Sequence, residues 1–300
     1  MKNASETTPS WSIHHLKSPV DGASIRYATI PSEEASYGIL LLNGRSEWIE
    51  KYATLPDKLE LGPRFLWATM DHRGQGGSEG ERAHVASYDD FAQDAAEVAR
   101  LAFGSRPYAI IAHSMGGLIG IYGSLMQHLH PKVTFLCSPL LGLKTPMPMI
   151  VARSLARIVA STRLGLLPIG SSSDRRQAFA GNILTSSYEG FKNVLTSPYA
   201  HAAPSFGWVN ATFAALDALA RPDLLKGLPC PVRILVGATE EVVDAAAYAP
   251  WVRLATQHSA QTVEWKRLGM GRHELLNEVE SIERLVLGDI KSWFKAHWIL

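Results

Sequence analysis

Ser114 is the residue whose neighbours indicate chemistry most clearly. It lies at the centre of the run AHSMG (residues 112–116), in which the positions two before and two after the serine are small. A serine on a sharp turn between a strand and a helix exposes its hydroxyl for attack on a carbonyl carbon. Because a free hydroxyl is a poor nucleophile at neutral pH, it needs a partner base that takes its proton. The pattern therefore predicts acyl transfer with Ser114 as the nucleophile.

His273 is predicted to be that base. It follows the last predicted strand (262–268) after a short connection that contains glycine, and a base in this place can turn back toward the serine. Two other histidines, His72 and His84, fall near the carboxyl edge of the predicted sheet and can also line a site. His113 flanks the serine directly and is expected to point away from it.

A carboxylate must hold the imidazole of the base in one tautomer and stabilise the imidazolium that forms. The loop after the predicted strand 232–236 offers three acids, Glu240, Glu241 and Asp244. Glu240 stands soon after the strand end, where its side chain can reach back across the sheet edge. We predict Glu240 as the acid, with Asp244 and then Glu241 as alternatives. A loop of solvated acids is the structural explanation that competes with all three.

Acyl transfer also needs N–H donors aimed at the developing oxyanion. One is the amide that follows the nucleophile, on Met115. The second is expected from the loop 43–48, where Gly44 permits an unusual backbone turn and Arg45 can present its amide. The side chain of Arg45 is not required for this role.

The elements that must position these residues are predicted to form an α/β fold, a mostly parallel sheet of eight strands with helices on both faces. Short apolar runs rich in β-forming residues alternate with longer helical patterns, which is typical of a parallel sheet. A leading antiparallel hairpin is predicted around the turn Asp21-Gly22. The predicted strands are 11–16, 24–29, 38–42, 65–70, 108–112, 133–137, 232–236 and 262–268.

The alternation of strands and helices stops after Pro139 and resumes only at Pro231. Between these prolines the apolar residues recur at helical spacing, so we expect a helical cap inserted into the sheet domain. The predicted division assigns residues 1–140 and 221–300 to the core and residues 141–220 to the cap.

Apolar residues of the cap are candidates for contact with substrate. The helical run 149–159 is apolar with a basic flank, so it can rest on an anionic membrane surface or admit an acyl chain. A cap helix that packs on its own domain, with its arginines in solvent, explains the same pattern. The candidates for the wall of an acyl pocket are Met149, Phe206, Trp208 and Phe213.

Composition excludes several classes of protein. The 300-residue chain has a formal net charge of +1, so no global field attracts nucleic acid. Its two cysteines, Cys137 and Cys230, form neither a CxxC pair nor a metal-ligand spacing, and we expect no metal and no organic cofactor. The first residues lack the parts of a secretory signal, and no apolar run reaches the roughly 18 to 20 residues that span a bilayer. We expect a cytoplasmic protein that contacts a membrane at most peripherally.

Four motifs occur in a fixed order along the chain: NGRSE (43–47), DHRGQGGS (71–78), HSMGG (113–117) and RHELLNE (272–278). Together they resemble the lysophospholipase L2 and monoacylglycerol lipase group of α/β-hydrolases, which is sometimes placed with the serine aminopeptidases. The resemblance covers nearly the whole chain. It implies an α/β-hydrolase fold and hydrolysis of a carboxylic ester of a single-chain acyl lipid.

Two positions depart from the usual pattern of that group. Ala112 replaces the first glycine of the turn around the nucleophile, and Glu240 stands where an aspartate is usual. Both changes are compatible with hydrolysis. A carboxylesterase, a thioesterase or an amino-terminal peptidase fits the same scaffold, because specificity depends on the cap. A non-catalytic binding protein that keeps the fold is the alternative of a different class.

Overall fold

The computed structural model describes residues 11–170, 178–199 and 202–298. These residues form an eight-stranded sheet in the order β1-β2-β4-β3-β5-β6-β7-β8, which confirms the predicted fold class. The first two strands pair antiparallel, β2 also pairs antiparallel with β4, and the remaining neighbours are parallel. The strands are β1 Ser12–Lys17, β2 Ser24–Ile30, β3 Tyr37–Leu42, β4 Phe65–Met70, β5 Tyr108–His113, β6 Val133–Cys137, β7 Val232–Val236 and β8 Val263–Arg267.

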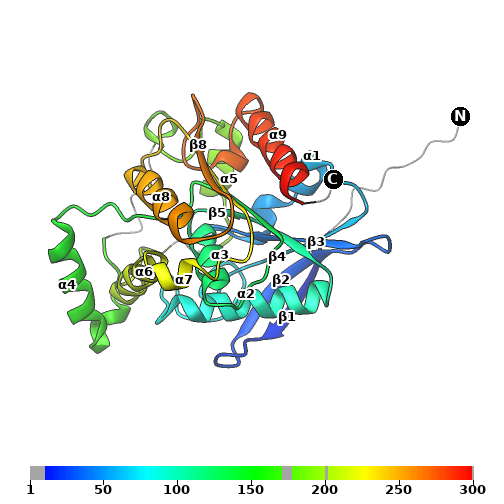
Figure 1. Ribbon diagram of the computed structural model, residues 1–300. Coiled ribbons are helices and arrows are strands. Elements are labelled where there is room, and N and C mark those ends of the chain that lie inside the picture. Colours follow the sequence, from blue (N-terminus) through cyan, green and yellow to red (C-terminus); the bar gives the residue numbers. More distant parts are fainter. Residues whose placement is uncertain (1–10, 171–177, 200–201, 299–300) are drawn as a thin grey trace, which may run out of the picture.

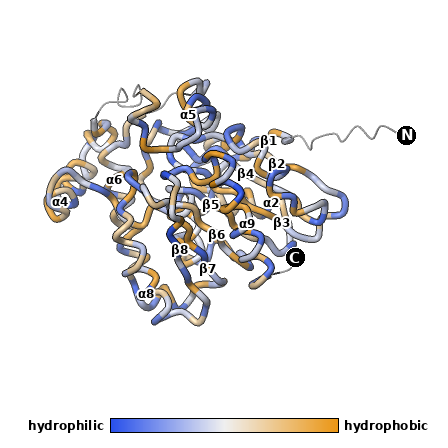
Figure 2. Tube along the Cα trace, turned by 90° about the horizontal axis from the view of Figure 1, so that it is seen from above, coloured by the Kyte–Doolittle hydropathy of each residue, from blue (hydrophilic) through white to orange (hydrophobic). Residues whose placement is uncertain are grey.

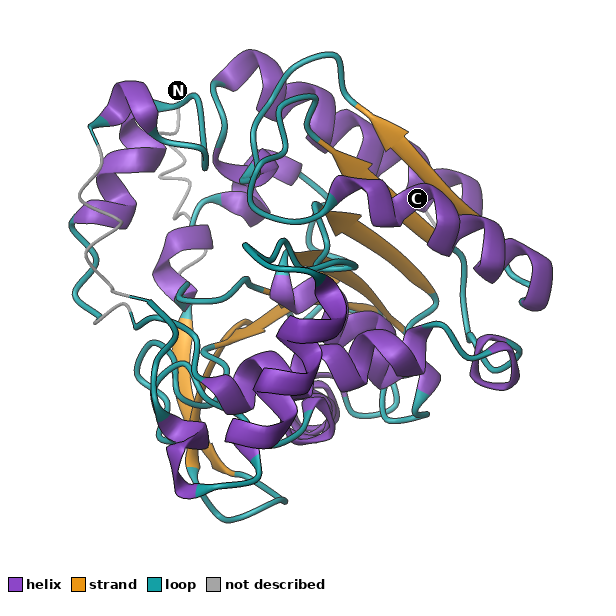
Figure 3. Ribbon diagram, turned by 90° about the vertical axis from the view of Figure 1, so that its left-hand side faces the viewer, coloured by secondary structure: helices purple, strands orange, loops and turns teal. Residues whose placement is uncertain are grey.

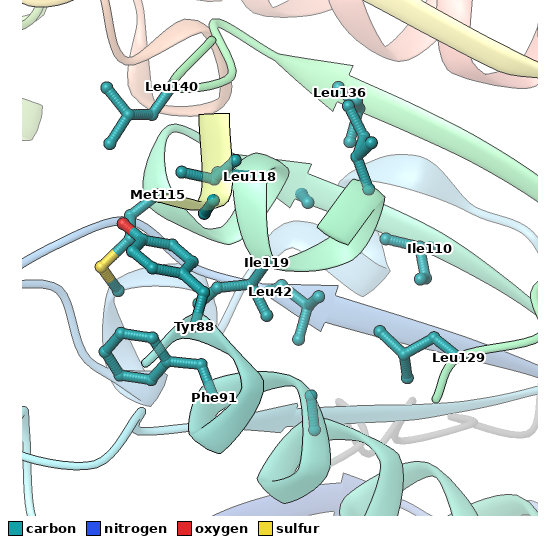
Figure 4. Packing of buried hydrophobic residues seen from close by; sticks show 14 of the residues in the cluster. Leu42, Tyr88, Phe91, Ile110, Met115, Leu118, Ile119, Leu129, Leu136 and Leu140 are labelled. Atoms are coloured by element: carbon teal, nitrogen blue, oxygen red, sulfur yellow. The ribbon is translucent and has the colours of Figure 1, made fainter. Parts of the chain in front are cut away.

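Helices cover both faces of the sheet (Figure 1 and Figure 3). Since successive strand residues point to opposite faces, Leu40 and Leu42 of β3 enter one buried cluster and Ile39 and Leu41 the other. The first cluster packs against α2 (Tyr88–Phe103), α3 (Met115–Leu125), α6 (Phe206–Leu219) and α8 (Tyr248–His258), and part of it is shown in Figure 4. The second packs against α1 (Leu55–Leu59) and α9 (Glu280–His297).

The segment between β6 and β7 is helical, as its spacing predicts. The expected helices over 149–159 and 206–219 are present as α4 (Met149–Ala160) and α6, whereas α5 (Tyr188–Leu195) was not predicted. The segment also contains the short helix α7 (Pro222–Leu225). Two short 3₁₀ helices described within the segment cover Arg163–Leu166 and Phe179–Gly181. Others outside it cover Ile49–Tyr52, Ala245–Ala247 and Leu275–Asn277.

Within that segment α6 and α4 differ in how they meet the rest of the molecule. Trp208, Ala211 and Ala215 of α6 belong to the buried cluster beside α3. Of α4, which packs on the far side of α6, only Ala156 is buried, and α4 lies at one end of the molecule (Figure 1). The division into a core and a cap stays a prediction. In the part of the chain that the structure describes, no helix combines the length and the apolar character that a membrane span requires.

The turn from β5 to α3 places Ser114 in an unusual backbone conformation. Ser114 has φ 51° and ψ −118°, a backbone conformation that residues other than glycine rarely adopt. The turn brings Gly116 so close to β3 that a Cβ atom there would lie 2.2 Å from the carbonyl oxygen of Leu42. This contact explains why the position two after the serine must be glycine.

Replacing Gly116 with alanine should therefore destabilise the fold and misplace Ser114. We expect Gly116→Ala to lower the free energy of unfolding by about 1–3 kcal/mol, because α3 must move away from β3. Gly120→Ala is the matched control, since a Cβ at Gly120 has its nearest neighbour at 3.5 Å and alanine favours a helix. Urea unfolding of both variants checks this, and equal stability of the two would contradict it.

Candidate active site

Three loops at the carboxyl edge of the sheet carry the predicted site residues. Ser114 follows β5, Glu240 follows β7, and His273 follows β8. The strands β5, β6, β7 and β8 are consecutive neighbours in the sheet. Because parallel strands all end at the same edge, residues far apart in the chain meet there.

The side chains of these three residues form a continuous chain of hydrogen bonds. Nε2 of His273 lies 3.0 Å from Oγ of Ser114, and Nδ1 lies 2.8 Å from Oε2 of Glu240. A carboxylate only accepts hydrogen bonds, so Nδ1 carries the proton and donates to Glu240. Nε2 is then left with its lone pair toward the serine hydroxyl. This is the tautomer in which an imidazole can take a proton from serine.

Glu240 is buried and held in its charged form. Burial alone would raise its pKa, but the hydrogen bond and charge of His273 and the amide donors of Val243 and Val242 outweigh that effect and lower the pKa to about 2. Only 8% of Glu240 and 3% of His273 is exposed. A carboxylate in such surroundings can stabilise an imidazolium strongly, because water does not screen it.

Glu240 is the one of the three candidate acids that contacts the histidine. The carboxylate of Asp244 instead accepts a hydrogen bond from the amide of Ala246, at 3.0 Å, and Glu241 is exposed.

Among the other histidines that the structure describes, only His113 lies beside Ser114. The expectation that it points away is wrong, because its ring packs on that of His273 with the centroids 4.7 Å apart. Its Nδ1 donates to the carbonyl oxygen of Cys137, which fixes this orientation. Burial lowers the pKa of His113 to about 4.

His72 and His84 do not reach the cavity beside Ser114. His72 is fully buried, its Nε2 lies 3.2 Å from the carbonyl oxygen of Asn43, and burial lowers its pKa to about 4. Nδ1 of His84 lies 2.8 Å from the hydroxyl of Ser205. Both histidines therefore make structural contacts and do not line the cavity.

The two residues predicted to supply oxyanion donors flank the serine. Met115 is the first residue of α3, and Arg45 lies in the loop after β3, where the carboxylate of Glu47 accepts a hydrogen bond from the amide of Gly44. The Arg45 side chain donates to the carbonyl oxygen of Ala202, at 3.0 Å. The guanidinium is thus used elsewhere, and the role of the two amides stays a prediction.

A cavity of about 80 Å³ opens beside Ser114. None of the four predicted acyl-wall residues is among those that line it: Trp208 and Phe213 are buried, Phe206 is half-buried, and Met149 is exposed on α4. Its apolar lining instead comes from Leu184, Val194 and Val242, which no sequence pattern singled out. The lining residues are Gly44, Arg45, Ser46, Glu47, Lys51, His113, Ser114, Leu184, Val194, Val242, His273 and Glu274.

The fold and this arrangement of residues define the class of protein, a serine hydrolase with an α/β-hydrolase fold. A family model described as "Serine aminopeptidase, S33" matches residues 33–280. The chain belongs to this family.

Proteins with related sequences support the same class. Lysophospholipase L2 of Escherichia coli (strain K12) is 28% identical over 93% of this chain and 86% of its own length. Monoacylglycerol lipase of Mycolicibacterium smegmatis is 23% identical over 94% of this chain and 97% of its own length. A solved structure of a soluble variant of monoglyceride lipase from Saccharomyces cerevisiae, in complex with a substrate analog, has a TM-score of 0.75 at 20% identity and covers 97% of each chain.

Neutralising Glu240 should remove most of the hydrolytic activity and part of the loss of stability at low pH. We expect Glu240→Gln to lower kcat roughly 10³- to 10⁴-fold, because an amide favours the wrong tautomer of His273. The pKa of Glu240 lies below its ordinary value of 4.5. Its contribution to stability, about 3 kcal/mol at most, is therefore present above about pH 4.5 and lost as the pH falls toward 2.

Initial rates and acid unfolding curves of the variant and of Asp244→Asn measure both effects. Asp244→Asn should keep kcat within about threefold of wild type, since its carboxylate accepts a hydrogen bond from the amide of Ala246 and His273 is bonded to Glu240 instead. A larger loss of kcat in Asp244→Asn than in Glu240→Gln would show that the acid is assigned to the wrong residue.

Proposed function

We propose that the protein hydrolyses the carboxylic ester of a single-chain acyl lipid, a lysophospholipid or a monoacylglycerol, through an acyl-enzyme on Ser114. The observation that carries the proposal is the chain of hydrogen bonds from Glu240 through His273 to Ser114, beside a cavity at the carboxyl edge of the sheet. Without the base, the serine hydroxyl would be too weak a nucleophile for this reaction.

The reaction proceeds in two halves. Nε2 of His273 takes the proton of Ser114 as Oγ bonds to the ester carbonyl carbon, and the amides of Met115 and Arg45 stabilise the oxyanion. The tetrahedral intermediate collapses with loss of the alcohol, which receives the proton from His273. A water molecule, deprotonated by the same histidine, then attacks the acyl-enzyme and releases the fatty acid. The proton returns to Ser114, so the enzyme is regenerated.

Two observations support an acyl ester over a peptide as the substrate. The relatives named above are called lysophospholipase and monoacylglycerol lipase. An amino-terminal peptidase needs a carboxylate that can bind the substrate's ammonium group. The carboxylates of Glu47 and Glu274 line the cavity, and they contact the ammonium of Lys51 at 2.6 and 2.7 Å. Both are therefore already paired with a cation of the protein, which disfavours binding of a substrate ammonium group.

Product release from a panel of substrates tests this assignment. Wild type should release fatty acid from monoacylglycerol or lysophosphatidylcholine faster than it cleaves acyl thioesters, water-soluble short-chain esters or aminoacyl amides. Ser114→Ala should be inactive on all of them, because it lacks the hydroxyl that His273 activates. Cleavage of aminoacyl amides at the highest kcat/KM would favour the peptidase. A folded wild type that cleaves none of them would favour a binding protein.

We also propose that residues 141–220 act as a cap whose outer helix contacts the lipid surface that holds the substrate. Ile150 and Ile158 of α4 are 79% and 65% exposed, and Figure 2 shows apolar residues on this outlying helix. Residues 141–170 contain four lysines and arginines and no acidic residue. Apolar side chains beside basic ones suit the interface of an anionic bilayer.

Charged residues on this helix should weaken binding to vesicles. We expect Ile150→Glu with Ile158→Glu to reduce sedimentation with phosphatidylglycerol vesicles at least about tenfold, since two isoleucines that would enter the bilayer are replaced by charged side chains. Leu101→Glu is the matched control, because Leu101 is 44% exposed on α2. Equal vesicle binding by the double variant and wild type would show that α4 does not dock on lipid.

A further inference from the structure

We infer that Lys51 is a positioning residue for this hydrolysis: its buried ammonium group holds the loop of the proposed oxyanion donor and the loop of His273 at a fixed separation. The inference rests on the proposed function, because it assigns Lys51 a role in that same site. Lys51 belongs to the short 3₁₀ helix Ile49–Tyr52 and lines the cavity beside Ser114.

The ammonium group joins two carboxylates that come from distant parts of the chain. Nζ of Lys51 lies 2.6 Å from Oε1 of Glu47 and 2.7 Å from Oε2 of Glu274. The side chains are almost inaccessible, with 2% of Lys51 and 5% of each glutamate exposed. We name these three residues the Lys51 cluster.

Glu47 connects the cluster to the oxyanion loop. Its Oε2 accepts hydrogen bonds from the amide of Gly44 and from the hydroxyl of Tyr52, the latter at 2.8 Å. The residue after Gly44 is Arg45, whose amide is the proposed second oxyanion donor. Fixing the Gly44 amide therefore limits how the next peptide unit can turn.

Glu274 connects the cluster to the general base, because it is the residue directly after His273. Its amide donates to the carbonyl oxygen of Leu184, at 2.8 Å, so both its backbone and its side chain are held. A shift of Glu274 moves the backbone of His273, and with it the Nε2 atom that lies 3.0 Å from Ser114.

The charges of the cluster favour a precise geometry. Burial alone would lower the pKa of Lys51, but Glu274 and Glu47 outweigh burial and raise it, so the ammonium stays charged. Burial alone would raise the pKa of Glu47, yet Lys51 and His113 bring it down to about 2. Buried ion pairs add little to stability compared with apolar side chains, and a role in fixing one geometry accounts better for their presence.

Steady-state kinetics of substituted proteins test the inference. In Lys51→Met the two loops lose their common partner, and a displacement of about 1 Å at reacting atoms can cost roughly 10²-fold in rate. We expect kcat on a water-soluble ester to fall at least about tenfold while KM stays within about threefold. Lys51→Arg, which keeps the charge, should recover most of the lost kcat.

Two further variants separate positioning from stability. Lys51→Met leaves the carboxylates of Glu47 and Glu274 without their shared cation. Adding Glu274→Gln removes one of these two charges, so the double variant should unfold at a higher temperature than Lys51→Met and still have a low kcat. Arg233→Met is the matched control. This substitution breaks the largely buried ion pair of Arg233 with Asp289, whose charged groups lie 3.0 Å apart. Arg233 lies at the start of β7, away from the end that Glu240 follows, so the variant should lose stability and keep its kcat.

The outcomes distinguish this inference from the proposed function. A folded Lys51→Met, or the double variant if the single one does not fold, with kcat within twofold of an active wild type would overturn the positioning role alone. A loss of kcat in Arg233→Met as large as that in Lys51→Met would overturn it as well. Absence of any ester hydrolysis by folded wild type would instead overturn the proposed function.

Discussion

The hydrogen bonds from Glu240 to His273 and from His273 to Ser114 form only if three loops reach one point. The bonded partners lie 33 and 159 positions apart in the sequence, and local structure cannot bring them together. The parallel sheet does so, because β5, β7 and β8 all end at the same edge. Reacting groups must be placed to within about 1 Å for fast acyl transfer. The rigidity of a sheet packed on both faces therefore serves the geometry of the site directly.

That geometry depends on one strained residue and on polar groups that water does not reach. Ser114 adopts a positive φ, which costs of order 1–3 kcal/mol and is held by the surrounding structure. The close approach of Gly116 to β3 permits the turn. The amide of Ser114 donates to the carbonyl oxygen of Cys137 in the buried neighbouring strand β6, at 3.1 Å, which holds the turn in place. The turn places the hydroxyl of Ser114 opposite the imidazole of His273, whose other nitrogen is hydrogen-bonded to the carboxylate of Glu240.

Much of the fold could be predicted, as could the three side chains that meet in the candidate site, because their signals are local. Apolar runs mark the strands, and small residues around Ser114 mark the turn. The choice of Glu240 over Asp244 followed from its place just after a strand. Glu47 and Glu274 of the Lys51 cluster stand in two of the four motifs, but nothing local indicates that Lys51, more than 200 positions from Glu274, joins them. Leu184 and Val194 were missed because no periodicity shows which side chains of an inserted segment face a cavity.

The most direct measurement of the central claim is peptide mass spectrometry of the protein after reaction with a fluorophosphonate, which transfers a phosphonyl group to an activated serine. The adduct should lie on Ser114, and it should form much more slowly in His273→Ala because the base is lost. A folded wild-type protein that forms no adduct, or one modified at another serine such as Ser46 or Ser138, would contradict the assignment of Ser114 as the nucleophile.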